Sequence, residues 1–340
     1  MRPLRMLVLL LAVASPVWAQ PRDTARASAP SATTFAIPAW AFPTQRPAPP
    51  DAFLTADSVH PHRIPGLTRT FTAKQALDRF APVDWDPGTH PPAPPSVARG
   101  RRPAAFACAF CHLYSGAGRP ENATLAGLSA EYIVQQVRAF RDSTRLAANP
   151  VTPVNSMHAM AKAFTDAEVA EAAAYFAGLT LTRRNRVVEG PTVPRHRVMN
   201  IFYVRDGTGA EPIAGRLIEM PEDAERHELH DPTVPYVTYV PPGSLALGRR
   251  VVRGGPAGVA TACATCHGPD LLGVGNIPPI AGRSPQYLLR QLLNIRSGAR
   301  ADSASAAMQA VVGAMSLQQM VAAAAYVGSL PPSARRPRAR

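Results

Sequence analysis

The sequence is short of cysteine, and none of its cysteines stands apart from the others. Its 340 residues include four cysteines. All four fall in two Cys-x-x-Cys pairs, and a histidine directly follows each pair. The motif residues are Cys108, Cys111 and His112 in the first copy, and Cys263, Cys266 and His267 in the second. This motif is typical of c-type haem attachment, where two thiols add across the porphyrin vinyl groups and the histidine gives the iron an axial nitrogen.

Two other uses of paired cysteines fit these motifs less well. A thioredoxin-like redox pair does not need histidine in the fifth position, and both copies have it. A structural zinc site usually pairs its two cysteine knuckles at closer range, whereas Cys263 follows Cys108 by 155 residues. The two complete copies therefore predict two covalently attached haem c groups.

The chain also lacks a long apolar run, so no membrane span is expected in the mature protein. Residues 6–14 are apolar, which is about half of the roughly 20 residues that cross a bilayer. Arg2 and Arg5 precede this stretch, and Val17-Trp18-Ala19 follows it with small or compact residues where a signal peptidase cleaves. We expect residues 1–19 to be a signal peptide, with a retained anchor as the alternative. The mature chain is then soluble and periplasmic.

Acidic residues are outnumbered, with 23 Asp and Glu against 36 Lys and Arg and a net charge of +13. A basic chain can bind nucleic acid, but the sequence shows no nucleic-acid motif and the expected compartment argues against that role. Docking to an acidic redox partner, or peripheral contact with anionic lipid, is the better expectation. The basic tail, residues 332–340, is expected to be solvated and without fixed structure.

Proline is abundant, with 37 residues, and it is concentrated in residues 38–103 and 190–245. We expect these stretches to be extended segments that wrap the domains without forming cores of their own.

The two halves of the chain repeat each other. At an offset of 155 residues, Tyr132 pairs with Tyr287, Gln136 with Gln291, and Arg145 with Arg300. The offset then becomes 151, and it pairs Met157 with Met308 and Tyr175 with Tyr326. Agreement over about 80 residues is typical of a duplicated domain.

Each repeat is expected to be helical. Residues 129–145 have apolar residues at helical spacing, with Ser129 as the N-cap. Thr165 and Glu168 have the spacing of a capping box that opens a helix running to residue 179. Residues 316–330 give the matching helix in the second repeat. Three short helices around a prosthetic group suit a domain of about 85 residues, because the group supplies part of the core.

The sixth iron ligand is expected to be methionine, because thioether sulfur stabilises ferrous iron. Met157 and Met308 occupy equivalent repeat positions. Met160 competes in the first repeat, but Val311 is its counterpart in the second. His158 could also bind iron, but its counterpart is Gln309. We therefore interpret His158 as a surface residue or one that lies behind the ligands.

With these residues the chain resembles the class I c-type cytochromes, and among them the di-haem cytochrome c4-like proteins. The resemblance covers residues 98–180 and 248–330. It implies a mainly α fold: two tandem class I cytochrome c domains with proline-rich extensions and a partly β inter-domain insert. The expected parts are a signal peptide (1–19), an N-terminal extension (20–97), domain 1 (98–183), the insert (184–245), domain 2 (246–331) and the tail (332–340).

The insert departs from the family pattern. Residues 197–204 and 234–240 have strand-prone residues in alternation, and we expect them to pair as a small ribbon. His227 and His230 lie three residues apart. With no third ligand evident, we interpret them as exposed loop histidines rather than a metal pair.

The resemblance and the motifs predict a carrier of single electrons with no catalytic residues. Its partners would be a dehydrogenase upstream or a terminal oxidase downstream. The alternative is a di-haem enzyme of the peroxidase or thiosulfate-oxidising type, which needs an open coordination site on one iron. A non-catalytic subunit of a larger dehydrogenase complex would still transfer electrons.

Overall fold

The computed structural model describes residues 35–44, 59–149, 152–255 and 261–332. The expected signal peptide and residues 333–340 of the basic tail lie outside these ranges. The chain divides into two units, Met1–Ala36 and Ile37–Arg340, and every element below belongs to the second. Within the described ranges, no helix is both long and apolar enough to cross a membrane.

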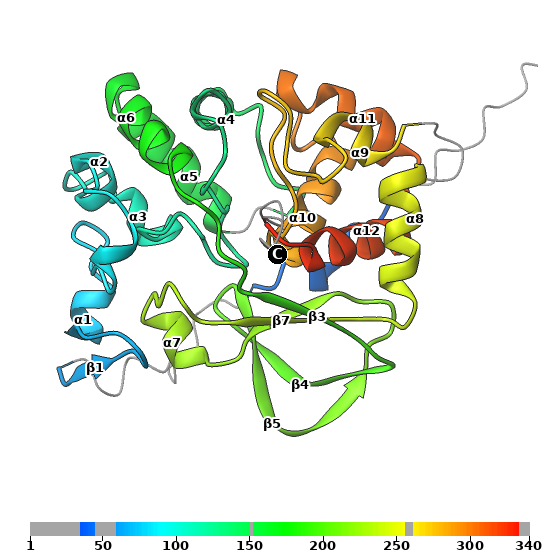
Figure 1. Ribbon diagram of the computed structural model, residues 1–340, viewed down its shortest axis with the longest axis horizontal. Coiled ribbons are helices and arrows are strands. Elements are labelled where there is room, and N and C mark those ends of the chain that lie inside the picture. Colours follow the sequence, from blue (N-terminus) through cyan, green and yellow to red (C-terminus); the bar gives the residue numbers. More distant parts are fainter. Residues whose placement is uncertain (1–34, 45–58, 150–151, 256–260, 333–340) are drawn as a thin grey trace, which may run out of the picture. The chain divides into compact units, whose positions relative to one another are not determined.

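The chain is mainly helical, as expected, and the helices fall into two groups that follow the repeat (Figure 1). The first group comprises α3 (Cys108–His112), α4 (Ala130–Arg141), α5 (Thr152–Ala163) and α6 (Asp166–Ala177). The second group comprises α8 (Ser244–Gly254), α9 (Cys263–His267), α10 (Pro285–Arg296), η3 (Ser303–Ser305), α11 (Ala306–Gly313) and α12 (Leu317–Ser329).

The helix starts follow from local sequence. Ser129 Oγ accepts the Tyr132 N–H over 3.1 Å at the start of α4. Thr165 and Glu168 form the expected capping box of α6, and Ser316 opens α12 in the same way. Each cap satisfies a backbone donor that the first helical turn leaves free. The predicted starts of these three helices are confirmed.

Close helix packing in the second repeat depends on one glycine. Gly248 lies on α8 where that helix crosses α12, and a Cβ there would meet the Ala322 carbonyl oxygen and the Tyr326 side chain. Glycine therefore sets how closely the two backbones approach.

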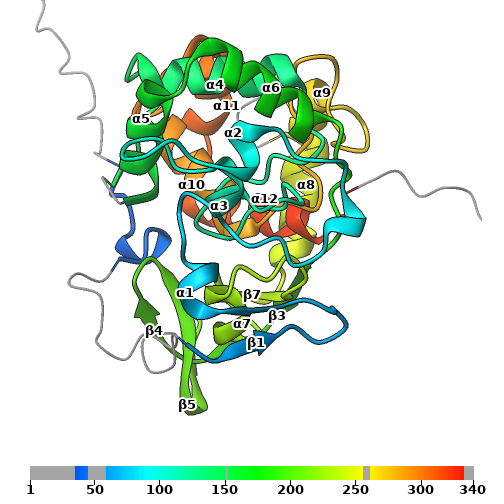
Figure 2. The same cartoon turned by 90° about the vertical axis from the view of Figure 1, so that its left-hand side faces the viewer.

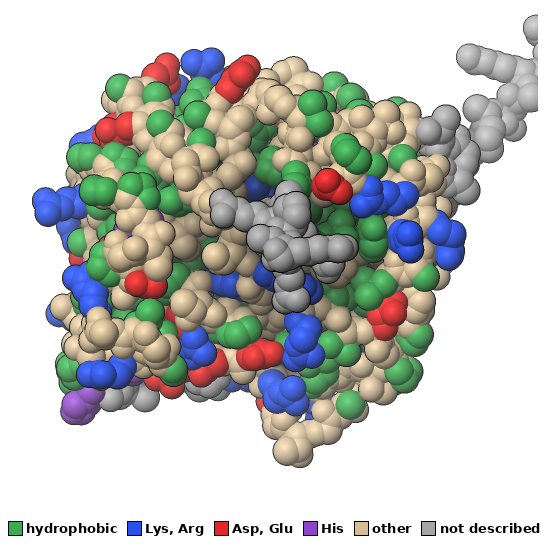
Figure 3. All heavy atoms as spheres, viewed as in Figure 1, with side chains coloured by type: hydrophobic (Ala, Val, Ile, Leu, Met, Phe, Trp, Pro, Cys, Tyr) green, Lys and Arg blue, Asp and Glu red, His purple; other side chains and the backbone are tan. Residues whose placement is uncertain are grey.

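Lys and Arg side chains gather over α8 on the face shown in Figure 3.

The N-terminal segment is more structured than its prolines indicate. It contains η1 (Ala39–Ala41), β1 (Pro61–Arg63), β2 (Thr70–Thr72), α1 (Ala73–Ala76), η2 (Pro87–Thr89) and α2 (Pro95–Ala98). Ile64, Ala73, Ala76 and Trp85 form a small buried core with Leu229 of the insert. Trp85 Nε1 also donates to the Leu229 carbonyl over 2.8 Å. Figures 1 and 2 both place α1 and β1 beside α7.

The insert forms two small sheets. Its elements are β3 (Asn185–Glu189), β4 (Thr192–Met199), β5 (Phe202–Pro212), β6 (Ile218–Pro221), α7 (Ala224–Glu228) and β7 (Tyr236–Val240). Strands β4 and β5 pair as an antiparallel hairpin, and the other sheet has the order β3-β7-β6. Val193, Tyr203, Ile213, Ile218 and Met220 form a buried cluster. The expectation that the proline-rich stretches lack cores of their own was therefore wrong.

The expected pairing of residues 197–204 with residues 234–240 was also wrong. Residues 197–204 fold back on themselves, since Met199 pairs with Phe202 across a two-residue turn. Asn200 occupies that turn with φ 53°, a conformation that asparagine adopts more readily than most residues. Strand β7 pairs instead with β3 in parallel and with β6 in antiparallel.

The two repeats meet across a pseudo-symmetric seam. The backbones of Arg145 and Arg300 pair in an isolated antiparallel β-bridge. The Leu146 N–H donates to the Ala299 carbonyl over 2.7 Å, and the Ala301 N–H donates to the Thr144 carbonyl over 2.8 Å. The 155-residue offset converts each of these two bonds into the other. The repeat read from sequence is thus also a structural relation between the two halves.

Candidate cofactor site

Each motif histidine ends its short helix and is held by one hydrogen bond. The Nδ1 atom of His112 lies 2.8 Å from the Ala123 carbonyl oxygen, and that of His267 lies 2.8 Å from the Pro278 carbonyl oxygen. A carbonyl oxygen can only accept, so Nδ1 carries the proton in both rings. The lone pair is then on Nε2, which is the form that ligates a metal.

Burial keeps both histidines neutral. His112 and His267 are each about 7% exposed. Burial lowers the pKa of His112 to about 4 and lowers the pKa of His267 as well, against the weaker effect of the carbonyl hydrogen bonds. A neutral imidazole is the protonation state that metal binding requires.

The four motif cysteines are free thiols. Burial raises the pKa of Cys108 to about 12 and also raises the pKa values of Cys111 and Cys263. Cys266 differs from the other three because it is exposed. None of the four is in a disulfide, so none has a competing covalent partner.

All eight predicted attachment and ligand residues line one cavity of about 980 Å³. This volume lies near the top of the range for small-molecule sites, about 300–1,000 Å³. They are Cys108, Cys111, His112, Met157, Cys263, Cys266, His267 and Met308. Much of the remaining wall is apolar, with side chains such as Phe140, Val169, Leu292 and Val311. The fold thus brings together residues that are far apart in the sequence.

The competing ligands of the first repeat have other contacts. Met157 and Met160 both line the cavity from α5. The Sδ atom of Met160 accepts the Phe106 N–H over 3.1 Å. His158 Nε2 lies 3.0 Å from the Arg145 carbonyl oxygen, and the ring packs edge-on against Phe140. These contacts favour Met157 over its two neighbours, and its role as a ligand stays a prediction.

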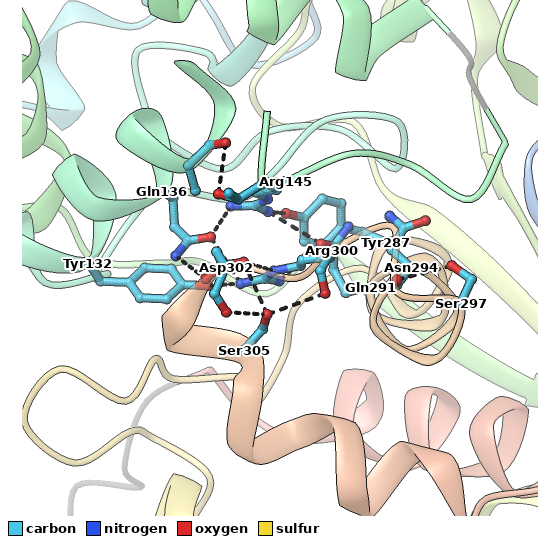
Figure 4. Close-up of polar contacts among 12 residues, drawn as sticks. Tyr132, Gln136, Arg145, Tyr287, Gln291, Asn294, Ser297, Arg300, Asp302 and Ser305 are labelled. Carbon is cyan, nitrogen blue, oxygen red and sulfur yellow. Dashed lines mark hydrogen bonds and ion pairs between the residues drawn. The ribbon is translucent and has the colours of Figure 1, made fainter. Parts of the chain in front are cut away.

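A buried polar network lines the cavity where the repeats meet (Figure 4). Arg145 donates to Tyr287 Oη over 3.0 Å, and Arg300 donates to Tyr132 Oη over 3.0 Å. Each guanidinium therefore crosses to the other repeat. Both also donate to side-chain oxygens of Gln136 and Gln291. The two tyrosines thus bond to the facing repeat.

The network holds more positive than negative charge. Asp302 pairs with Arg300 over 3.2 Å. Burial opposes ionisation of this carboxyl, but Arg300 outweighs it and keeps the pKa of Asp302 below its usual value. Among the described residues, no carboxylate is paired with Arg145 in an ion pair. An apolar wall with a surplus guanidinium fits a flat apolar group that carries acidic side chains, as haem does with its propionates.

Sequence reasoning missed a buried cluster from the insert. His227 is fully buried and lies 3.3 Å from Glu121, and its Nδ1 lies 3.0 Å from Tyr236 Oη. His230 is also buried. The interpretation of these two histidines as exposed was therefore wrong. Only the tertiary fold brings Glu121 to His227, so no local pattern reveals the cluster.

Residues 252–331 match the family model described as Cytochrome c. The second repeat is therefore similar to cytochrome c. The chain is 28% identical over 237 residues to a thiosulfate dehydrogenase electron acceptor of Stutzerimonas stutzeri (strain A1501), covering 68% of this chain and 82% of that protein. It is 26% identical over 246 residues to cytochrome c4 of Azotobacter vinelandii, covering 69% of this chain and 89% of that one.

Among solved structures, the chain is similar to the thiosulfate dehydrogenase TsdBA from Marichromatium purpuratum in its as-isolated form. The identity is 27% and the TM-score is 0.46. The match covers 67% of this chain but 37% of that chain.

Proposed function

We propose that this protein is a di-haem c-type cytochrome that carries single electrons between redox partners. The observation that carries the proposal is the matched pair of motif histidines. Each is neutral, each is fixed through Nδ1 to a backbone carbonyl, and each lies on a cavity wall with two thiols and a methionine.

His112 with Met157 would hold one iron, and His267 with Met308 would hold the other. The cysteines of each motif would form the thioether bonds. When bound, each haem supplies an iron that cycles between the ferric and ferrous states. The chain's residues supply the rest: the carbonyls of Ala123 and Pro278 orient the two imidazoles.

The cavity wall would favour electron transfer over catalysis. Apolar side chains exclude water from the site, and the Arg145 and Arg300 guanidiniums would neutralise haem propionates. A methionine in each sixth position would leave no site open for a substrate. No residue of the chain is then required as an acid or a base, so we propose no catalytic residues.

The partners would be redox proteins. Two relatives are named thiosulfate dehydrogenase electron acceptors, so a dehydrogenase of that kind is the first electron donor to test. A terminal oxidase would be a downstream acceptor. Haem attachment of this type needs export, so we propose a periplasmic location reached through the signal peptide at residues 1–19.

Haem stoichiometry tests the proposal directly. The holoprotein should carry two covalently bound haems, measured by intact mass and by haem absorbance per chain. Cys108→Ala with Cys111→Ala, and Cys263→Ala with Cys266→Ala, should each remove one haem and so serve as controls for one another. A wild-type chain exported with intact thiols and no covalent haem would overturn the proposal.

A further inference from the structure

The loops that follow the two motif histidines occupy equivalent repeat positions but differ in exposure. In the second repeat, Val274 is 57% exposed and Ile277 is 39% exposed. At the same positions in the first repeat stand Arg119 and Asn122, and the Arg119 side chain is 11% exposed. At these two positions the second copy of the loop is open to solvent where the first is covered, although Asn276 between them bonds to Ser129 and Gln135 of the first repeat.

The insert covers the first loop. Arg119 pairs with Glu121 over 3.0 Å and donates to the His227 carbonyl over 3.4 Å. Phe110, inside the first motif, packs edge-on against His230 with 4.7 Å between the ring centroids. The equivalent residue of the second motif is Thr265, which is exposed.

The N-terminal segment covers the same side of the first repeat. The Ala107 N–H donates to the Arg79 carbonyl over 2.9 Å, directly before the first motif cysteine. Phe80 packs against Phe106 with 5.3 Å between centroids, and the Arg79 guanidinium lies over the Phe106 ring. Arg79 and Phe106 both line the cavity, so the segment closes its wall there.

The second motif lies open beside a basic helix. Thr265 and Val274 are exposed and lie outside the cavity wall, whereas their neighbours Cys266 and Ile277 line it, so the wall and the surface adjoin there. Arg249, Arg250 and Arg253 are exposed on α8, where Figure 3 shows basic side chains gathered. Arg253 donates to the Pro269 carbonyl and so joins α8 to this loop. Asp270 is the loop's one carboxylate.

We propose that electrons enter and leave this protein through the second motif, at a docking surface made of Val274, Ile277 and the α8 arginines. The first site would exchange electrons through the second. The occupant is a redox protein with an acidic docking face. As a donor it loses one electron for each that the cytochrome gains, and as an acceptor it gains one for each that the cytochrome loses. This inference rests on the proposed function.

The chemistry of the surface fits such a partner. An apolar centre with a charged rim is the usual composition of a protein interface. Three arginines against one aspartate give a positive field that steers an acidic partner and speeds its association. The covered first loop presents neither feature, since its equivalent positions hold a buried ion pair and a half-buried amide.

Binding of an anion can be mapped without electron transfer. Hexacyanochromate(III), a paramagnetic trianion, should broaden the backbone amide signals of residues 244–254 and 268–277 in the oxidised holoprotein at low ionic strength. Signals of residues 113–122 should be unaffected. Broadening centred on residues 113–122, or spread evenly over the basic surface, would overturn the proposal.

Electron exchange can be followed with hexacyanoferrate(III), which takes one electron from each reduced haem in stopped-flow experiments. Val274→Glu, Ile277→Glu and Arg250→Glu should each slow oxidation about 5- to 10-fold at low salt, because each makes the docking surface less positive. Leu77→Glu on the N-terminal segment and Arg205→Glu on β5 make matched charge changes elsewhere, and neither should alter the rate.

The two haems can be distinguished in these experiments because each gives half of the absorbance change. Both halves of the absorbance change should slow together in the docking variants, because electrons from the first site leave through the second. Wild-type rates for half of the amplitude, or for all of it, would overturn the proposal. Unchanged haem content and spectra in the variants would leave the proposed function standing, so the two ideas fail separately.

Discussion

At the scale of single residues, the two motif histidines show how backbone geometry prepares a ligand. Each ring has one nitrogen held by a carbonyl eleven residues further along the chain. That bond fixes the tautomer and the ring orientation that a metal ligand needs. The cost of burying a polar ring is offset by the same bond, and neutrality avoids the larger cost of burying a charge.

The choice of sixth ligand leads to a paired prediction. Met157→Leu should open the first iron, so that the reduced protein binds about one carbon monoxide per chain and its first reduction potential falls. Met160→Leu preserves size and removes only the sulfur that accepts from Phe106, so it should bind none. Carbon monoxide titration followed by absorbance separates the two. Binding by Met160→Leu alone would assign the ligand to Met160.

The buried carboxyl of Glu219 should make the stability of the protein depend on pH. Burial raises its pKa to about 7 from the usual 4.5, despite hydrogen bonds from Gln286 and Ser284 that lower it. Between about pH 4.5 and 7, the folded state holds a proton on Glu219 that the unfolded state releases. The stabilisation by the protonated carboxyl is therefore fully present below pH 4.5 and is lost as the pH rises through 7. Its size is roughly 3 kcal/mol.

Glu219→Gln should flatten that dependence, which unfolding measured at a series of pH values between 4.5 and 8 can test. Glu222→Gln, just beyond the same strand and exposed, is the matched control and should preserve the slope. An identical slope in wild type and Glu219→Gln would contradict the assignment.

At the scale of elements, local sequence was enough to place the capped helices but not the partners of the strands. Ser129 and Thr165 define helix starts through bonds that span three residues. The pairing of β7 with β3 instead depends on contacts between segments far apart in the chain. The hairpin turn at Asn200 had a local signal, since asparagine tolerates positive φ.

The seam between the repeats should be sensitive to its arginines. Arg300 bonds to Tyr132, Gln136 and Asp302 while buried. Arg300→Ala would leave the Asp302 charge buried without its partner, and we expect a loss of about 3 kcal/mol. Denaturant unfolding of the holoprotein measures this loss. The exposed Arg138→Ala should change stability by less than about 0.5 kcal/mol, and equal effects of the two changes would refute a structural role for the seam.

At the scale of the whole molecule, the duplication and its haem motifs could be predicted because each motif is contained in a few adjacent residues. The asymmetry between the repeats could not, because it arises from the insert and the N-terminal segment meeting over the first repeat. Glu121 with His227, and Trp85 with Leu229, join residues that no sequence pattern relates. The same contacts bury His227 and His230, which were expected to be exposed.

The packing of the N-terminal segment against the insert should contribute strongly to stability. Trp85 is 2% exposed and packs edge-on against Phe71. Trp85→Ala should cost about 3–5 kcal/mol through the cavity it leaves. Trp85→Phe retains an aromatic ring and loses the bond to Leu229, so it should cost less. Thermal unfolding of the two variants shows which substitution costs more stability. A Trp85→Ala protein as stable as wild type would show that this packing adds nothing.

Under the proposed function both irons have closed coordination, so the protein would carry electrons and would not act as an enzyme. The most direct test is to add carbon monoxide to the fully reduced, purified holoprotein and to record its absorbance spectrum. We expect two haems per chain and no spectral change on addition. Carbon monoxide binding to either haem of the wild-type protein would contradict this expectation and point to an open, reactive iron.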